Sequence, residues 1–212
     1  MVDAEAGHAE GYMSVAEGEA SHAEGSAYYN EETQTWENPT TASGFASHAE
    51  GISTKALQKA GHAEGIRTEA KYYAHAEGWY TKAYGDHSHA EGSTTEANGD
   101  SSHAEGWYTR TEHEAAHAEG AGSIASGFGA HAEGGTNEYE KNSDGTYNII
   151  NPTTASGEFS HAEGCSTIAS GDASHAEGSS VVFTDLTGDE EVNIEVKNIA
   201  KGYGSHVEGG GT

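Results

Sequence analysis

Residues 47–60, Ser-His-Ala-Glu-Gly-Ile-Ser-Thr-Lys-Ala-Leu-Gln-Lys-Ala, form one unit of the repeat that decides the fold of this chain. The tetrapeptide motif His-Ala-Glu-Gly, which begins here at His48, occurs eleven times in the chain, and a twelfth copy reads His206-Val-Glu-Gly. Successive motif histidines are mostly 14 residues apart. Such a short fixed period predicts a solenoid, in which each repeat buries its faces against its neighbours and function resides along the surface.

Each 14-residue unit contains two short alternating segments separated by glycine-containing turns, which is typical of β-strands. A helix is disfavoured because glycine inside every unit would cost about 1 kcal/mol per helical position. Side chains alternate across a strand, so Ser47 and Ala49 share one face while His48 and Glu50 share the other. We therefore expect an all-β, flattened parallel β-roll with two strands per turn.

The second segment of each unit predicts what fills this roll. Its Ser and Thr positions fall on the same face as its alanines, so small residues from both strands meet in a narrow core. The polar column is Ser14, Thr40, Thr54, Thr68, Thr81, Thr95, Thr109, Ser123, Thr153 and Thr167. The opposite face carries Lys55, Glu69, Lys82, Glu96 and Arg110, whose charges alternate from unit to unit. Stacked about 4.8 Å apart, they would pair, although a solvated face with fortuitous order gives the same pattern.

Three segments interrupt the period, at about 26–39, 136–152 and 180–197. The first two resemble β-hairpins, and each is followed by the repeat through the same sequence, Asn-Pro-Thr-Thr-Ala-Ser-Gly. The third runs from Val181 through Thr187-Gly188-Asp189 to Val196. We expect one repeat domain over 1–212, with all three insertions leaving from one edge of the roll, where binding loops are tolerated.

Composition excludes several classes of function. The chain has 35 acidic and 9 basic residues, so nucleic acid and anionic membrane surfaces are poor partners. No apolar run approaches the roughly 20 residues of a membrane span. Cys165 is the single cysteine, which leaves no intrachain disulfide and no thiolate zinc site. The start of the chain lacks the basic and apolar regions of a signal peptide, so we expect either that export uses another route or that the sequence is a fragment of a longer protein. Low hydrophobicity and high charge are typical of disorder, but strict periodicity favours regular strands.

The remaining face is a ladder of His and Glu, two residues apart on each first strand. Twelve copies of an acid–base pair argue for structure over catalysis. Three interpretations stay open. The ladder binds metal ions repeatedly, or it is a solvent-exposed face without a specific role, or it is an oligomer interface in which imidazoles and carboxylates offset each other's charge. For the interface interpretation the contact residues are His8, Glu10, His22, Glu24, His48, Glu50, His62, Glu64, His75, Glu77, His89, Glu91, His103, Glu105, His117, Glu119, His131, Glu133, His161, Glu163, His175, Glu177, His206 and Glu208.

Burial of this ladder would make assembly depend on pH. If Glu holds the imidazoles protonated, their pKa values rise and the stabilisation is lost as the pH increases. If the imidazoles are buried neutral, their pKa values fall and acid weakens the assembly.

Ser14-Val-Ala-Glu-Gly18, followed by Ser21-His-Ala-Glu-Gly25, resembles the head repeat of the YadA-like trimeric autotransporter adhesins. The resemblance covers nearly the whole chain apart from the insertions. It implies a left-handed parallel β-roll that forms a side-by-side homotrimer with the His–Glu positions inside. A polar pair replaces the aliphatic pair of that family. The repeated His-Ala-Glu-Gly sequence is also similar to repeats of bacteriophage tail or neck appendage proteins.

We therefore expect a non-enzymatic fibre or adhesin segment, without a cofactor, that acts as a rigid trimeric spacer on a phage particle or a bacterial cell surface. Its partners would be its own copies and a host-surface glycan or protein, with no nucleic acid and no membrane insertion. The candidate binding residues are Tyr28, Tyr29, Trp36, Trp79, Tyr80, Trp107, Tyr108, Tyr139 and Tyr147. These aromatic side chains serve equally well as packing on neighbouring rungs.

Two other classes of function remain. An ice-binding solenoid is disfavoured because its single Thr column faces inward. A glycan-cleaving tailspike would need a non-repeated carboxylate pair in a groove. The insertions contain Glu31, Glu32, Asp185 and 189–191, but no spacing among them singles out an acid and a nucleophile.

Overall fold

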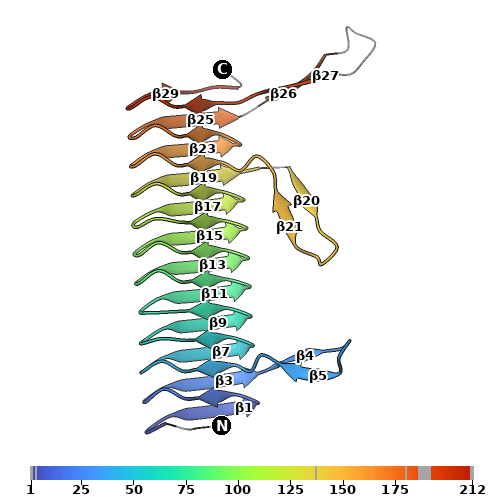
Figure 1. The fold of residues 1–212 in the computed structure, drawn as a ribbon, viewed down its shortest axis with the longest axis vertical. Helices are drawn as coiled ribbons and strands as arrows, with labels where there is room; N and C mark the ends of the chain where they lie inside the picture. The colour runs from blue at the N-terminus through green and yellow to red at the C-terminus, as the bar shows by residue number, and fades with distance from the viewer. Residues whose placement is uncertain (1, 3, 137, 180, 186–191, 211–212) are drawn as a thin grey trace. The chain divides into compact units, whose positions relative to one another are not determined.

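The computed structural model describes residues 2, 4–136, 138–179, 181–185 and 192–210. This part of the chain is all-β and contains no helix, and therefore no helix of the length and hydropathy needed to cross a membrane. It is a parallel β-solenoid of about twelve coils at the 14-residue spacing of the repeat (Figure 1). The coils divide into two compact units, Met1–Trp107 and Tyr108–Thr212, which are described in turn.

The first unit has one long and one short strand in each coil. The long strands start at the motif histidines and pair in parallel: β1 (His8–Tyr12), β3 (His22–Ser26), β7 (His48–Ile52), β9 (His62–Ile66), β11 (His75–Trp79), β13 (His89–Ser93) and β15 (His103–Trp107). The short strands form the second sheet: β2 (Val15–Ala16), β6 (Thr41–Ala42), β8 (Lys55–Ala56), β10 (Glu69–Ala70), β12 (Lys82–Ala83) and β14 (Glu96–Ala97). The register places each motif residue on its counterpart, as with His48 on His62.

The second unit repeats this arrangement. Its long strands are β17 (His117–Ala121), β19 (His131–Gly135), β23 (His161–Cys165), β25 (His175–Ser179) and β29 (His206–Val207). Its short strands are β16 (Arg110–Thr111), β18 (Ile124–Ala125), β22 (Thr154–Ala155), β24 (Ile168–Ala169) and β28 (Ile199–Ala200). The register stays in phase across the second insertion, because His131 lies on His161 although 30 residues separate them.

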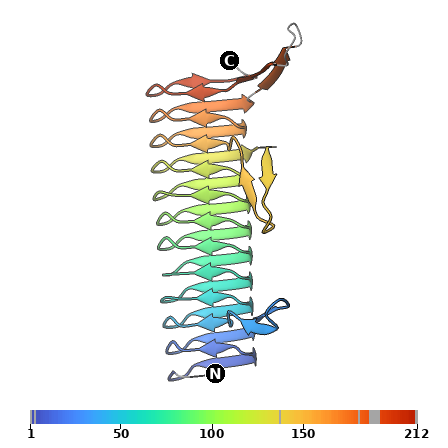
Figure 2. The same cartoon turned by 45° about the vertical axis from the view of Figure 1, so that its right-hand side comes forward.

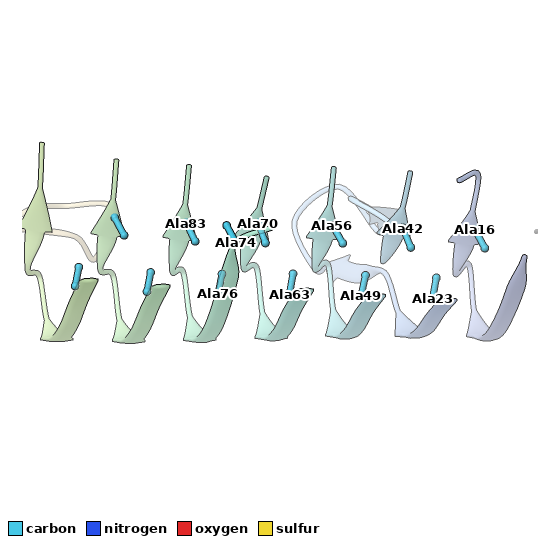
Figure 3. Close-up of a cluster of buried hydrophobic side chains, with 13 residues drawn as sticks. Ala16, Ala23, Ala42, Ala49, Ala56, Ala63, Ala70, Ala74, Ala76 and Ala83 are labelled. Atoms are coloured by element: carbon cyan, nitrogen blue, oxygen red, sulfur yellow. The ribbon is translucent and has the colours of Figure 1, made fainter. Parts of the chain in front are cut away.

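The core is the narrow layer of small side chains that the alternation predicts. Alanines of the two facing sheets, such as Ala49 and Ala56, point toward each other and are fully buried (Figure 3). Ser47 lies on the same face as Ala49 and is also buried. Such a core has no room for larger side chains, so its stability depends on close backbone approach and on the satisfaction of its polar groups.

The Ser and Thr column of the second sheet is buried as predicted, and some of its hydroxyls bond the backbone of other coils. Thr40 Oγ1 donates to the carbonyls of Ser26 and Gly51, each at 2.9 Å, and Thr153 contacts those of Gly135 and Gly164 at 2.9 and 2.8 Å. Both threonines follow an insertion. The threonines therefore help to anchor the chain where an insertion rejoins the roll.

Thr153→Val is expected to destabilise the protein by about 1–2 kcal/mol, because two buried carbonyls lose a hydroxyl partner. The matched change Thr68→Val is expected to cost nothing or to stabilise slightly. The Thr68 hydroxyl is buried and, among the described residues, has no hydrogen-bond partner. Urea unfolding of both variants measures the difference; equal losses would contradict this role of Thr153.

Three antiparallel strand pairs lie outside the coils (Figures 1 and 2). They are β4 (Tyr28–Asn30) with β5 (Thr35–Glu37), β20 (Tyr139–Lys141) with β21 (Tyr147–Ile149), and β26 (Val181–Asp185) with β27 (Val192–Val196). Each pair falls within one of the three interruptions of the period. Of the third interruption, residues 180 and 186–191, including Thr187-Gly188-Asp189 and the acidic residues at 189–191, lie outside the described part.

Candidate functional surfaces

The His–Glu ladder is the most regular polar surface of both units. In the first unit neighbouring histidine rings from His8 to His103 stack with centroids 4.7–4.9 Å apart. In the second unit, from His117 to His206, the separation is 4.7–4.8 Å. The in-phase register imposes this stacking, because each ring lies directly on the equivalent ring of the next strand.

Most ladder side chains are about one-third exposed, and imidazole nitrogens lie near carboxylates. Nε2 of His22 is 3.5 Å from Glu24 on the same strand, and Nε2 of His161 is 3.6 Å from Glu133 on the preceding long strand. Nε2 of His48, His62 and His75 is inaccessible to water and forms no hydrogen bond within the described part of the chain. A single chain therefore leaves these polar atoms without a partner, which is costly when they are buried.

Burial favours the neutral form of the ladder histidines. Desolvation lowers the pKa values of His48, His62, His89, His117, His131 and His161, and the charge of a neighbouring histidine lowers them further. The nearby glutamates act in the opposite direction without reversing the shift. Of the two pH responses considered above, this direction favours the one in which acid destabilises the ladder.

The glutamates of the second unit interact with one another. Glu119, Glu133 and Glu163 line a surface hollow of about 370 Å³. Hydrogen bonding to Glu119, and next to Glu163, raises the pKa of Glu133 to about 7. Parallel stacking brings like carboxylates together, so proton sharing relieves their repulsion. The formal charge of the chain therefore overstates the negative charge of this surface near neutral pH.

The ladder places possible metal ligands together but does not aim them at one point. The donor atoms of His62, Glu64 and His75 all lie within 4.8 Å of one another. The His62 and His75 rings are 2° from parallel, and the lone pair of an imidazole nitrogen lies in its ring plane. Two parallel lone pairs cannot both point at one Zn²⁺ about 2.0–2.1 Å from each nitrogen. Metal binding by one chain would require at least one ring to rotate out of the stack.

The charged column on the outer face of the second sheet forms ion pairs, as the alternating signs predict. Lys55 Nζ is 3.2 Å from Glu69 and Lys82 Nζ is 2.7 Å from Glu96, in both cases on the next short strand. Arg110 instead pairs at 2.8 Å with Glu112, two residues later in the chain. The fortuitous-order interpretation therefore does not hold for the two lysine pairs.

The aromatic residues of the first interruption form a partly exposed cluster. Trp36 on β5 packs against Tyr29 on β4 with ring centroids 5.0 Å apart, and against Tyr12 of the roll at 4.7 Å. Tyr28, Tyr29 and Trp36 remain 37%, 41% and 43% exposed. They therefore both attach this strand pair to the roll and present aromatic surface to solvent.

The other candidate aromatics divide between packing and exposure. Trp79 is exposed and meets the Tyr80 ring edge-on at 4.6 Å, and Tyr139 is exposed on β20. Tyr147 packs edge-to-face with both Tyr139 and Tyr108, and its backbone N–H donates to the Tyr108 hydroxyl at 3.0 Å. Trp107 is half-buried at the end of β15. Tyr108 and Tyr147 therefore serve mainly in packing, whereas about half of the Trp79 and Tyr139 side chains is exposed to solvent.

Sequence reasoning missed Arg67. It lies in the turn between β9 and β10, and its guanidinium carbon lies over the Tyr28 ring, 4.0 Å from the ring centre, and 5.0 Å from the Tyr80 ring centre. The sequence does contain one indication of a basic surface here, because five of the nine basic residues fall between Lys55 and Lys82 in a strongly acidic chain. The repeat itself gives no reason for an arginine at this position.

Comparison of the chain with protein-family models and with curated proteins gives no match.

Proposed function

We propose that this protein is a non-enzymatic fibre or adhesin segment, built as a side-by-side homotrimer of left-handed β-rolls. In this proposal the roll is a rigid spacer on a phage particle or a bacterial surface, and the strand pairs outside the coils attach to a host-surface glycan or protein. Because the fold is a regular solenoid with strand pairs outside its coils, it supports a scaffold that carries binding elements.

The His–Glu ladder is the observation that carries the trimer. Buried nitrogens at His48, His62 and His75 have no hydrogen-bond partner in the described chain, and the side chains around them are still partly exposed. A second and third copy placed against this face would bury the exposed parts of these His and Glu side chains and bring ladders of complementary groups together. Removing one partner of such a pair would be costly, so the ladder would also fix the register between chains.

The strand pairs support a role in attachment. Their sequences are not dictated by the repeat, and they expose Tyr28, Tyr29, Trp36 and Tyr139. Aromatic side chains of this kind dominate contact energy at interfaces. Three copies around one axis would also strengthen a weak single contact when several receptors are engaged together.

Replacing residues 26–39 and 136–152 by the short turn used elsewhere, such as Ile52-Ser53, tests this proposal. We expect the shortened chain to keep its fold and trimeric mass, since shorter loops cost little to close, and to lose most of its binding to host cells. Analytical ultracentrifugation and a cell-binding assay measure the two properties. A monomeric parent would contradict the trimer, and a shortened trimer that binds host cells as tightly as the parent would contradict attachment through the strand pairs.

A further inference from the structure

One surface hollow of the first unit differs from the rest of this acidic protein in charge. It has a volume of about 360 Å³ and lies beside the outer face of the second sheet, where Lys55, Arg67, Glu69, Tyr80 and Lys82 contribute to its wall. Three of the nine basic side chains of the chain thus surround one hollow. Its size falls in the lower part of the range for ligand-binding clefts.

The carboxylates beside this hollow are already engaged. Glu69 accepts a hydrogen bond from Lys55 at 3.2 Å through one oxygen and from the Tyr84 hydroxyl at 2.6 Å through the other. Glu96 accepts from Lys82 at 2.7 Å. Each of these carboxylates is therefore already paired with a lysine, which offsets its charge beside the hollow.

Arg67 is held in place without forming an ion pair within the described residues. The Tyr28 ring lies 4.0 Å from its guanidinium carbon, which is close enough for a cation–π interaction. Glu37 is near enough for the Arg67 charge to contribute to its lowered pKa, but hydrogen bonds from Thr33 and Thr35 are the larger causes. A cation–π contact does not consume the N–H donors of a guanidinium, so they can still donate to a ligand.

We propose that this hollow binds a saccharide that carries a carboxylate, so that it is one site of the host attachment proposed above. Arg67 would donate two parallel hydrogen bonds to the sugar carboxylate, the geometry in which arginine recognises this group best. Lys55 and Lys82, which pair with Glu69 and Glu96, would offset these carboxylates so that they do not cancel the Arg67 charge. Tyr80, which forms part of the wall, would add an aromatic contact to the sugar. This site is not repeated, as expected for specific recognition on a periodic scaffold.

Titration calorimetry on the whole chain tests the site, with trigalacturonate as the probe and galactotriose as its uncharged counterpart. We expect the protein to bind trigalacturonate and to bind galactotriose at least tenfold more weakly, since the uncharged sugar lacks the carboxylate that accepts the charge-assisted hydrogen bonds of Arg67. Arg67→Gln should weaken trigalacturonate binding at least tenfold. Arg67→Lys should recover part of this loss, because it retains the charge but not the planar fork. Arg110→Gln is the matched control, because Arg110 already pairs with Glu112, and it should bind as the parent does.

Circular dichroism and sedimentation accompany each titration, so that a folding defect is separated from a binding defect. Equal affinity for the charged and uncharged trisaccharides, unchanged binding by folded Arg67→Gln, or no heat at millimolar trigalacturonate would overturn the site. A monomeric mass would contradict the trimer without affecting the site, and host attachment that survives Arg67→Gln would refer the attachment to the other aromatic surfaces.

Discussion

Gly78→Ala is expected to destabilise the protein by about 3 kcal/mol or more. Gly78 has φ +116°, a conformation that costs other residues about 1–3 kcal/mol. A Cβ at this position would also collide with the carbonyl oxygen of Gly92 on the next long strand. The neighbouring atom is backbone, so relief requires the strands to separate, which adds a packing cost of about 1–3 kcal/mol.

Gly145→Ala is the control for this prediction. Gly145 also has a positive φ, of +87°, but a Cβ there meets no atom within 4 Å. It should therefore show the conformational cost alone, and the difference between the two variants isolates the contact between stacked strands. Urea unfolding gives both values. Equal losses would mean that the close approach of strands at the motif glycine does not limit the fold.

The strands, their register and the core could be predicted from the sequence because one period determines all three. Once His48 and Glu50 point outward, Ser47 and Ala49 must point inward, and the same residues recur in each coil. The ion pair between Lys55 and Glu69 follows from the same register. These features depend only on neighbours one repeat away, so a local pattern contains the needed information.

The functional surfaces depend on contacts that the period does not describe. Arg67 acquires its environment from Tyr28, 39 residues earlier in the first interruption. Arg110 belongs to the alternating column but bonds Glu112, because a long side chain can reach a partner two residues later in the chain. The parallel orientation of the histidine rings, which argues against a preformed metal site in one chain, is likewise a property of side-chain rotamers. None of these follows from residue spacing.

Acidification is expected to destabilise the protein strongly below about pH 6.5. Desolvation lowers the folded-state pKa values of six ladder histidines below the unfolded value of about 6.5. Their unfolded forms therefore bind protons first, so the stability present above the unfolded pKa is lost as the pH falls through the folded pKa. Glu133 acts oppositely, because its folded pKa of about 7 lies above the unfolded value. Because six histidines oppose this one glutamate, the net effect of acid is to destabilise the protein.

Solvent screening at these partly exposed rings reduces the effect of each proton. Even a net uptake of two protons on unfolding changes the stability by about 2.7 kcal/mol per pH unit, or roughly 5–10 °C in Tm for a chain of this size. Thermal melts and sedimentation between pH 8 and pH 5 measure this response. Replacing His48, His62 and His89 together by Gln should flatten it, because Gln does not titrate in this range. If the parent has a constant Tm over this interval, the histidines are not desolvated in the folded state, and the ladder is a solvated face that needs no second chain.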